Sequence, residues 1–274
     1  MPELPEVETT RRGIAPHIAG RQLTDVIIRQ PQLRWAIPAN LADKLKNHTL
    51  NQVDRRAKYL LFRFNHGYLL IHLGMSGSLR IVDPETMPVM AHDHVDFLFS
   101  DHCAMRYHDP RRFGAILWSD SDVDPQNHPL LHHLGPEPLT DAFTSDYLFR
   151  QSRQRKKDIK TFIMDNKVVV GVGNIYANEA LFSAGIRPTK AAGRLTKKHC
   201  LALVDEIRRI LQQAIDQGGN TLRDFVNGDG KPGYFAQQLN VYGRGGKACK
   251  GCGGVLKTIR QAQRATVYCT NCQR

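Results

Sequence analysis

The stretches Cys-Lys-Gly-Cys at 249–252 and Cys-Thr-Asn-Cys at 269–272 lie sixteen residues apart near the C-terminus. Each pair holds two thiolates on one side of a tight turn, and two such pairs close a tetrahedral Zn²⁺ site. Because four protein ligands leave no coordination position open for water, the one predicted zinc ion is structural. Residues 255–259 and 265–268 predict a hairpin between the pairs, which is too small to fold without its metal. The predicted ligands are Cys249, Cys252, Cys269 and Cys272.

The cysteine-bearing segment is strongly basic. No acidic residue follows Asp229, and the segment carries the cations Lys247, Lys250, Lys257, Arg260, Arg264 and Arg274. A second cluster of cations consists of Arg150, Arg153, Arg155, Lys156, Lys157 and Lys160. A cluster of charge is usually a solvated face. Two clusters combined with a zinc hairpin favour contact with the phosphates of DNA.

The chain between these clusters is predicted to be helical. Apolar residues at helical spacing follow Thr196, the predicted N-cap, and they are Cys200, Leu203, Val204, Ile207, Ile210, Leu211 and Ala214. Gly171 and Gly173 follow a valine run, but Tyr176 stands where the third small residue of a dinucleotide-binding motif belongs. Residues 171–179 instead predict a turn that opens a helix, whose amides and Asn174 bind a phosphate. Glycines recur from 218 to 246 and predict loops.

The first 120 residues predict mostly β-structure. Residues 58–64 and 68–73 flank a turn at Asn65, His66 and Gly67 and predict a hairpin. Short strands are predicted at 78–82, 95–99, 103–108 and 115–118, a spacing typical of a sandwich or barrel. Residues 3–18 predict a helix, because acidic residues come early and arginines late. The Asp-, Pro- and His-rich stretch 119–139 predicts a domain boundary.

The composition limits the class of protein. The 274 residues are 41% hydrophobic and 23% charged, which excludes a disordered tail protein and a fibrous repeat. A net charge of +12 predicts a polyanionic partner, with nucleic acid the first to test. The apolar runs are too short to span a bilayer, and the acidic N-terminus lacks the apolar region of a secretory signal. We therefore expect a soluble intracellular protein with no membrane partner.

The N-terminus is a candidate nucleophile. Removal of Met1 leaves Pro2 with a secondary amine, and an α-amino group has an ordinary pKa of about 8, against about 10.4 for lysine. Such an amine is partly unprotonated at neutral pH and attacks an aldehyde-like carbon to form an iminium. Glu3 and Glu6 are three residues apart on one face of the predicted helix and are candidates for acid and base. The alternative is structural, because proline and acids in a first turn also start a helix well.

Two loops combine apolar residues with arginine or glycine. Residues 109–114 place Phe113 beside Arg111 and Arg112, between a proline and a glycine. An apolar wedge flanked by arginine is how proteins unstack a base and take its place. Residues 72–77 carry Met75 among glycines. The alternative is that both apolar side chains belong to the buried core.

Taken together, these motifs resemble those of the bacterial formamidopyrimidine-DNA glycosylases, which repair oxidised purines. The resemblance covers nearly the whole chain, in order. It is carried by PELPEVE (2–8), HLGMSGSLR (72–80), HDHVDF (92–97), DPRRFG (109–114), DNKVVVGVGNIYANE (165–179), DGKPGYFAQQLNVYGR (229–244) and the four-cysteine finger. Ala57 departs from the family, which often has glycine there, although Lys58 follows it.

The resemblance implies a multidomain α+β protein with an N-terminal β-sandwich and flanking helices, a helix-two-turn-helix bundle and a C-terminal zinc-finger β-hairpin. We expect the catalytic β-sandwich domain at residues 1–125 and a linker at 126–139. The helix-two-turn-helix DNA-binding domain is expected at 140–236 and the zinc finger at 237–274. The implied partner is damaged double-stranded DNA, bound by a monomer in the bacterial cytoplasm in association with the nucleoid.

The resemblance also implies a bifunctional glycosylase and lyase. Pro2 would attack C1′ of the damaged nucleotide and form a Schiff base, with Glu3 as the catalytic acid and Glu6 near the sugar and the everted base. Lys58 and Arg264 would donate protons in β- and δ-elimination. The implied DNA-binding residues are His72, Met75, His92, Arg111, Phe113, Arg155, Lys160, Asn174, Tyr242 and, in addition to its catalytic role, Arg264.

Three of these residues are expected to replace the everted base. Met75, Arg111 and Phe113 would fill the space that it leaves, with Arg111 facing the orphaned cytosine. The loop that follows Gly218 would cover the base once it has left the helix.

Two other functions remain open at this point. A zinc-finger DNA-binding protein without catalysis would share the basic finger, and the free amine of Pro2 is what distinguishes it from the enzyme. Within the enzymes, a glycosylase for oxidised pyrimidines, similar to endonuclease VIII, is the closer rival. An assay on paired duplexes separates these two glycosylases.

Overall fold

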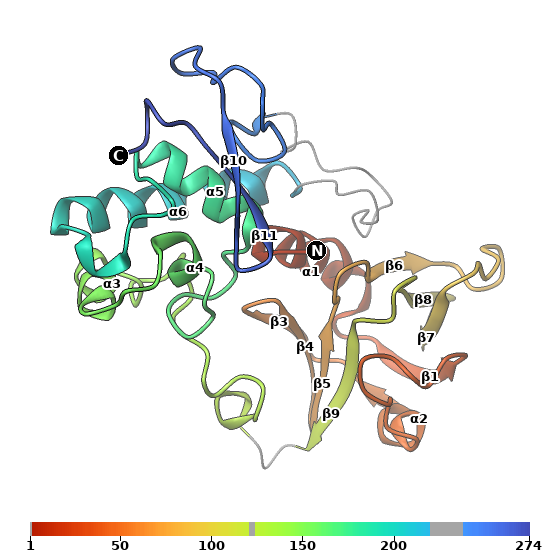
Figure 1. Cartoon of the computed structure of the whole chain (residues 1–274). Coiled ribbons are helices and arrows are strands. Elements are labelled where there is room, and N and C mark those ends of the chain that lie inside the picture. The colour runs from red at the N-terminus through yellow and green to blue at the C-terminus, as the bar shows by residue number, and fades with distance from the viewer. Residues whose placement is uncertain (1, 121–123, 220–237) are drawn as a thin grey trace. The chain divides into compact units, whose positions relative to one another are not determined.

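The computed structural model describes residues 2–120, 124–219 and 238–274, which form two compact units (Figure 1). The first unit contains the described residues up to His132 together with Gln217–Gly219. The second contains His133–Asp216 and residues 238–274. In the described part, no helix is both long and apolar enough to cross a lipid bilayer.

The first unit is a β-sandwich of two antiparallel sheets, which confirms the predicted fold class for this half. The five-stranded sheet has the order β2 (His48–Thr49), β1 (Gln22–Ile28), β7 (Asp93–Phe99), β8 (Cys103–His108) and β6 (Ser78–Val82). The four-stranded sheet has the order β3 (Gln52–Arg56), β4 (Tyr59–Phe64), β5 (Gly67–His72) and β9 (Ala115–Asp120). The predicted hairpin is confirmed, since β4 and β5 pair from Phe64 with Gly67 to Tyr59 with His72.

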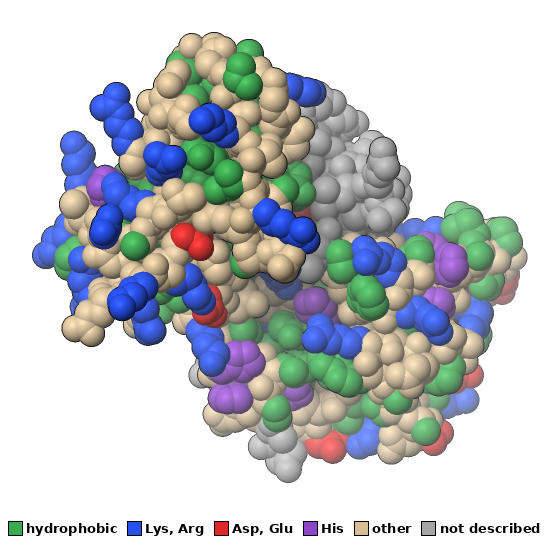
Figure 2. Space-filling view, viewed as in Figure 1, with side chains coloured by type: hydrophobic (Ala, Val, Ile, Leu, Met, Phe, Trp, Pro, Cys, Tyr) green, Lys and Arg blue, Asp and Glu red, His purple; other side chains and the backbone are tan. Residues whose placement is uncertain are grey.

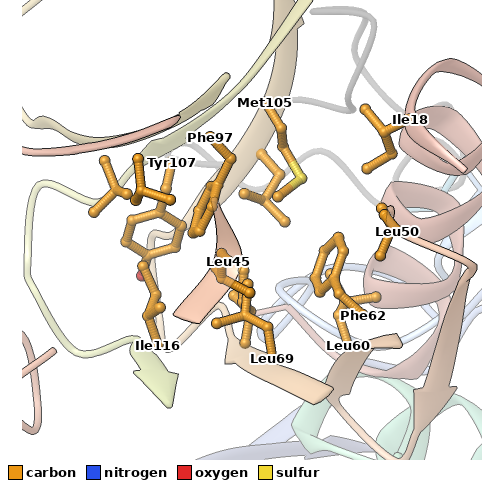
Figure 3. Close-up of a cluster of buried hydrophobic side chains, with 14 of the residues drawn as sticks. Ile18, Leu45, Leu50, Leu60, Phe62, Leu69, Phe97, Met105, Tyr107 and Ile116 are labelled. Atoms are coloured by element: carbon orange, nitrogen blue, oxygen red, sulfur yellow. The ribbon is translucent and has the colours of Figure 1, made fainter. Parts of the chain in front are cut away.

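The core of this unit lies between the two sheets (Figure 3). Phe62 and Leu69 contribute from the four-stranded sheet, and Phe97 and Met105 contribute from the five-stranded sheet; all four are at most 1% exposed. Ile18, at the end of helix α1, belongs to the same cluster. Because alternate residues of each strand point into this core, the loops at the strand ends are held in fixed positions.

Helix α1 (Leu4–Ile18) is attached to the sandwich by apolar contacts and by one buried carboxylate. The side chain of Glu8 accepts from Arg11 and Arg12 on its own helix and from Arg55 Nε on β3, at 3.0 Å. Burial raises the pKa of Glu8, but the hydrogen bonds from Arg11 and Arg12 outweigh it and bring that pKa down to about 2. Helix α1 is therefore fixed against β3, the strand that precedes Lys58.

The second unit is helical, with a two-stranded hairpin at its C-terminal end. Its helices are α3 (Ser145–Ser152), α4 (Ile159–Ile163), α5 (Asn174–Ser183) and α6 (Lys197–Asp216), and its strands are β10 (Lys257–Gln261) and β11 (Arg264–Tyr268). The predicted apolar stripe of α6 is confirmed, because all seven of its residues are buried. The predicted N-cap is also confirmed, since Thr196 Oγ1 accepts from the amide of His199 at 3.2 Å.

Some elements of the sandwich were not predicted, and one strand of the hairpin is shifted. Strands β1, β2 and β3 and the short helix α2 (Leu41–Leu45) have no counterpart in the sequence prediction. In the hairpin, the first strand begins at Lys257 rather than at residue 255, and Val255 is 66% exposed. The two-residue turn at Ala262 and Gln263, both with positive φ, sets this register.

Candidate functional site

The start of the chain is buried and held by its own helix cap. Pro2, Glu3 and Glu6 are all buried, with Glu6 0% exposed. Glu3 is the N-cap of α1, and its amide donates to Glu6 Oε2 at 2.8 Å. Gly219 lies against this carboxylate, since a Cβ there would meet Glu6 Cγ at 3.4 Å. These acids therefore do start the helix, as the structural interpretation expects, and the cap fixes the backbone that carries the Pro2 nitrogen. The catalytic roles predicted for Glu3 and Glu6 stay predictions.

Lys58 lies in the turn directly before β4, and His72 is the last residue of β5, the neighbouring strand of the four-stranded sheet. Lys58 follows Ala57, whose backbone lies in the left-handed region with φ +54°. Glycine adopts this conformation without strain, which explains why it suits that position. The ring of His72 lies 4.8 Å from that of Tyr59, its partner across the β4–β5 pair. Nδ1 of His72 accepts from the amide of Gly74 at 3.0 Å, so the ring proton is assigned to Nε2. His72 therefore presents a neutral N–H donor.

The imidazole of His72 is kept neutral by its surroundings. Burial lowers its pKa to about 4, with help from the nearby charges of Lys58 and Arg34. Protonation of Nδ1 would also break the bond from Gly74.

The protein is expected to lose stability as the pH falls from about 6.5 to about 4, because the unfolded state binds a proton at His72 before the folded state does. Above pH 6.5 this contribution is fully present, and its upper limit is about 3 kcal/mol. The measurement is the free energy of unfolding in urea at pH 7 and pH 5, for the wild type and for His72→Gln. The variant is expected to lose less stability between these pH values, and equal losses would contradict the assignment.

The two loops predicted to hold the wedge residues expose them. Met75 is 37% exposed and Phe113 is 47% exposed, so the interpretation of both as core residues is wrong. Arg111 is exposed, and its Cζ lies 5.0 Å from the centre of the Phe113 ring. This stacking joins the guanidinium and the ring into one amphipathic projection. His92 is also exposed, directly before β7.

Most of the predicted contacts of the second unit lie at its surface or at element ends. Arg155 and Arg264 are exposed. Asn174 begins α5 directly after the cap residue Gly173, which confirms the predicted turn and helix start. The amide of Tyr242 donates to Glu179 Oε1 at 2.8 Å, which fixes the backbone there. Figure 2 shows lysine and arginine side chains spread over the visible face of this unit, with few acidic side chains among them.

Lys160 differs from these residues because it is 1% exposed. Its Nζ donates to Thr266 Oγ1 at 2.6 Å and to the carbonyl of Ala265 at 3.0 Å. In this structure the ammonium therefore connects α4 to the strand that begins with Arg264. The contact with DNA predicted for Lys160 stays a prediction. Lys160 and Arg264 line one pocket, and the other residues that line it are Lys157, Thr161, Met164, Asp165, Gln261 and Ala262.

The four predicted zinc ligands lie together. Their sulfur atoms are all within 4.8 Å of one another, with 3.9 Å between Cys249 and Cys272 and 3.4 Å between Cys252 and Cys269. A tetrahedral zinc with Zn–S bonds of about 2.3 Å places its sulfurs about 3.8 Å apart, so the group fits. The amide of Gly251 points at Cys249 Sγ, at 3.4 Å, and stabilises a thiolate. These cysteines form the site of one structural zinc ion.

Two residues that support the loops of Met75 and Phe113 were not predicted from the sequence. Asp109 and Ser76 are fully buried and hydrogen-bonded to each other at 2.7 Å. The only signal in the sequence is that both belong to the motifs that carry Arg111 and Met75. The loop predicted to cover an everted base falls within residues 220–237, which lie outside the described residues.

Three family models match successive parts of the chain. Residues 1–116 match the formamidopyrimidine-DNA glycosylase N-terminal domain. Residues 134–226 match the formamidopyrimidine-DNA glycosylase H2TH domain, and residues 246–274 match the zinc finger found in FPG and IleRS.

Curated proteins and solved structures are similar over the full length. The chain is 61% identical to a formamidopyrimidine-DNA glycosylase of Saccharophagus degradans over 274 residues and 60% identical to one of Cellvibrio japonicus over 273 residues, with 100% of each chain covered. The crystal structure of Fpg from Thermus thermophilus superposes with a TM-score of 0.88 at 36% identity, over 99% of this chain and 98% of that one. A complex of Lactococcus lactis Fpg with DNA containing an abasic site gives 0.90 at 33% identity, over 99% of both.

Proposed function

Because this chain belongs to the formamidopyrimidine-DNA glycosylase family and is a DNA glycosylase of base excision repair, we propose that it removes oxidised purines and then cleaves the strand. The proposed substrates are 8-oxoguanine and formamidopyrimidines in double-stranded DNA. The observation that carries the proposal is the start of the chain, where Pro2 directly precedes a buried, capped helix start with two carboxylates.

The proposed first step is attack of the Pro2 nitrogen on C1′ of the damaged nucleotide, after removal of Met1 has freed the amine. The bond between C1′ and the base breaks, and the base leaves with the bonding electrons and a proton. Glu3 supplies the proton that allows the sugar ring to open at its oxygen. The product is an iminium between Pro2 and C1′, a Schiff base that remains positively charged because a secondary amine has no second proton to lose.

The positive iminium makes the next steps possible. It acidifies the hydrogen on C2′, and loss of that proton expels the 3′ phosphate in β-elimination. A second elimination expels the 5′ phosphate and leaves a one-nucleotide gap. We assign the proton donors of these two steps to Lys58 and Arg264, the cations that match the family pattern. The neutral Nε2–H of His72, close to Lys58, is assigned to a phosphate oxygen of the same strand.

Chemistry at C1′ requires the nucleotide to leave the stacked duplex, which costs a few kcal/mol. Insertion of Met75 and Phe113 into the vacated space offsets this cost, and both side chains have the exposure that insertion needs. The exposed cations of the second unit, Arg155 and Arg264 among them, are proposed to contact the backbone with Asn174 and Tyr242. Relatives support this, since Lactococcus lactis Fpg variants form complexes with DNA containing Fapy-dG.

Arg111→Ala is expected to weaken the preference for cytosine over adenine opposite the lesion by about 1–3 kcal/mol, as for loss of one good bidentate contact. The measurement is the dissociation constant for the two duplexes. Arg112→Ala is the matched control, because Arg112 is the neighbouring exposed arginine. Phe113→Ala is expected to weaken binding whichever base lies opposite. An unchanged preference in Arg111→Ala would remove Arg111 from this role.

Borohydride trapping tests the function as a whole. The protein is mixed with duplex DNA containing 8-oxoguanine opposite cytosine, and borohydride reduces the iminium to a stable protein–DNA adduct. Undamaged duplex should give no adduct, and a duplex with an oxidised pyrimidine should give less. The opposite order would favour an activity like that of endonuclease VIII. No adduct with any damaged duplex would contradict the Schiff-base mechanism.

The place of action follows from the proposed substrate. The relatives are bacterial proteins, and bacterial chromosomal DNA lies in the cytoplasm. We therefore propose that this protein works on the nucleoid, as a monomer that binds one lesion at a time.

A further inference from the structure

The turn that carries Met75 and the loop that carries Arg111 and Phe113 are built as one piece. Gly74 has φ +65°, and a Cβ there would collide with the backbone of Phe113. Gly114 is as tightly enclosed, because a Cβ would collide with the hydroxyl of Tyr107. The two loops therefore touch through atoms that leave no space for a side chain. In close-packed protein, neither loop can shift without displacing the other.

A single buried carboxylate lies under both loops. Asp109 is 0% exposed, and its carboxylate accepts from Ser76 Oγ at 2.7 Å, from the Tyr107 hydroxyl at 3.0 Å and from the amide of Gly114 at 2.9 Å. Burial raises the pKa of Tyr107 far above its ordinary value, with the charge of Asp109 adding to the effect, so the hydroxyl remains a donor. Each carboxylate oxygen therefore has at least one partner.

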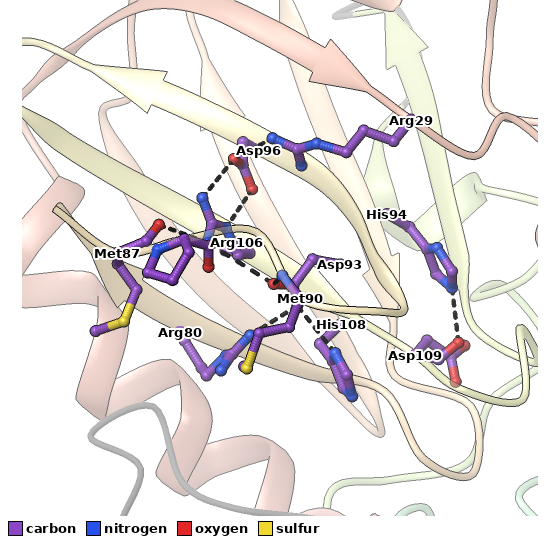
Figure 4. Close-up of polar contacts among 11 residues, drawn as sticks. Arg29, Arg80, Met87, Met90, Asp93, His94, Asp96, Arg106, His108 and Asp109 are labelled. Carbon is purple, nitrogen blue, oxygen red and sulfur yellow. Dashed lines mark hydrogen bonds and ion pairs between the residues drawn. The ribbon is translucent and has the colours of Figure 1, made fainter. Parts of the chain in front are cut away.

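The backbone of Asp109 is held from the side of the five-stranded sheet. Its amide donates to the carbonyl of His92 at 3.1 Å. His94, on β7, points at Asp109, and its Nε2 lies 2.8 Å from the carbonyl oxygen (Figure 4). The neighbouring β7–β8 pair is itself fixed by the buried ion pair of Arg106 and Asp96, at 2.8 Å. The backbone that carries the carboxylate is therefore fixed to the five-stranded sheet.

Ser76 is the link between the two loops. Its hydroxyl donates to Asp109 and accepts from the amide of Arg111 at 3.2 Å. Ser76 is 0% exposed and directly follows Met75 in the chain. One hydroxyl therefore joins the backbone beside Met75 to the backbone of Arg111.

We propose that Asp109 and Ser76 are positioning residues that hold Met75, Arg111 and Phe113 at a fixed spacing, so that the three side chains enter DNA as a preformed unit. The inference rests on the proposed function, which places these side chains in the space of the everted base. A preformed wedge loses little conformational entropy on binding, whereas separate mobile loops would have to be ordered by the DNA. The spacing also keeps Arg111 opposite one base of the partner strand.

The test uses Ser76→Ala in the full-length zinc-bound protein, because removal of Asp109 would leave three buried donors without an acceptor. Amide hydrogen exchange without DNA should be at least about tenfold faster at Arg111 than in the wild type. The dissociation constant for a duplex with 8-oxoguanine opposite cytosine should rise about tenfold, and the preference for cytosine over adenine should fall. Ser78→Ala is the matched control, since Ser78 is a buried serine on β6 whose hydroxyl makes no hydrogen bond to Asp109 in the described part of the chain.

The outcomes separate this proposal from the proposed function. Unchanged exchange at Arg111 in Ser76→Ala would overturn it, as would faster exchange with wild-type affinity and preference. Equal effects of Ser76→Ala and Ser78→Ala would also overturn it, because they would reflect general loosening. A wild-type protein that does not distinguish lesion DNA from undamaged DNA would overturn both proposals, whereas a normal wild type with a normal Ser76→Ala variant overturns only this one.

Discussion

Cys249→Ser is expected to release zinc, to unfold the C-terminal hairpin and to weaken binding of lesion DNA by at least about 100-fold. The reason is the size of the finger's own core. Its buried cluster consists of Val241, Cys249, Leu256, Val267 and Cys269, so two of its five members are themselves metal ligands. Such a core cannot offset the entropy of ordering the hairpin, whereas a structural zinc contributes on the order of 10–16 kcal/mol.

Zinc content per chain and the dissociation constant for a lesion duplex measure this effect. Cys103→Ser is the matched control, because Cys103 is a buried thiol of the β-sandwich that does not belong to the four-cysteine group. The sandwich of Cys249→Ser should keep its own thermal transition, since its core is a separate cluster. A variant that keeps one zinc per chain and normal DNA binding would show that the metal site has been misassigned.

The elements that were predicted are those that form because of a pattern within their own stretch of sequence. Helix α6 follows from a 3.6-residue apolar stripe after Thr196, and the β4–β5 hairpin follows from two apolar runs around a short turn. The zinc site follows from cysteine spacing alone. The residues of β1 are also apolar and β-branched in part, but the strand is defined by pairing with β7, about 70 residues further along the chain. No pattern within residues 22–28 shows that their pairing partner is β7.

The pattern of charged residues predicted the DNA-binding residues less fully than the cysteine spacing predicted the zinc ligands. Lys160 belongs to a run of cations, yet its ammonium is buried against Thr266, more than a hundred residues away. Asp109 is one acid among the 26 acidic residues of the chain, and only the fold shows that it accepts from Ser76 and Gly114. A sequence shows which groups can bind phosphate or accept a hydrogen bond. The fold decides which of them is already occupied.

Pro2→Gly is expected to lower base excision by at least about 100-fold, equivalent to about 3 kcal/mol in the barrier. Glycine still allows Met1 to be removed, so the variant keeps a free terminal amine, but that amine is primary. Its Schiff base can lose a proton and become neutral, and a neutral imine acidifies the C2′ hydrogen less than an iminium does. The variant is therefore expected to keep part of the lyase activity on a preformed abasic site while it loses most of the glycosylase activity. Mass spectrometry of the N-terminal peptide confirms that Met1 has been removed.

The matched control is Pro5→Ala, because Pro5 is buried as Pro2 is, but it lies in the first turn of α1, where its nitrogen is part of a peptide bond and cannot form an iminium. Pro5→Ala should still be trapped by borohydride, and the adduct should map to the peptide that begins with Pro2. Glu3→Gln completes the series. The amide can still cap α1 but cannot donate the proton that opens the sugar, so base removal should fall by about 10²–10⁴-fold and cleavage of an abasic site by much less. An adduct that maps to Lys58, in the wild type or in any of these variants, would move the nucleophile from the chain start to the turn before β4.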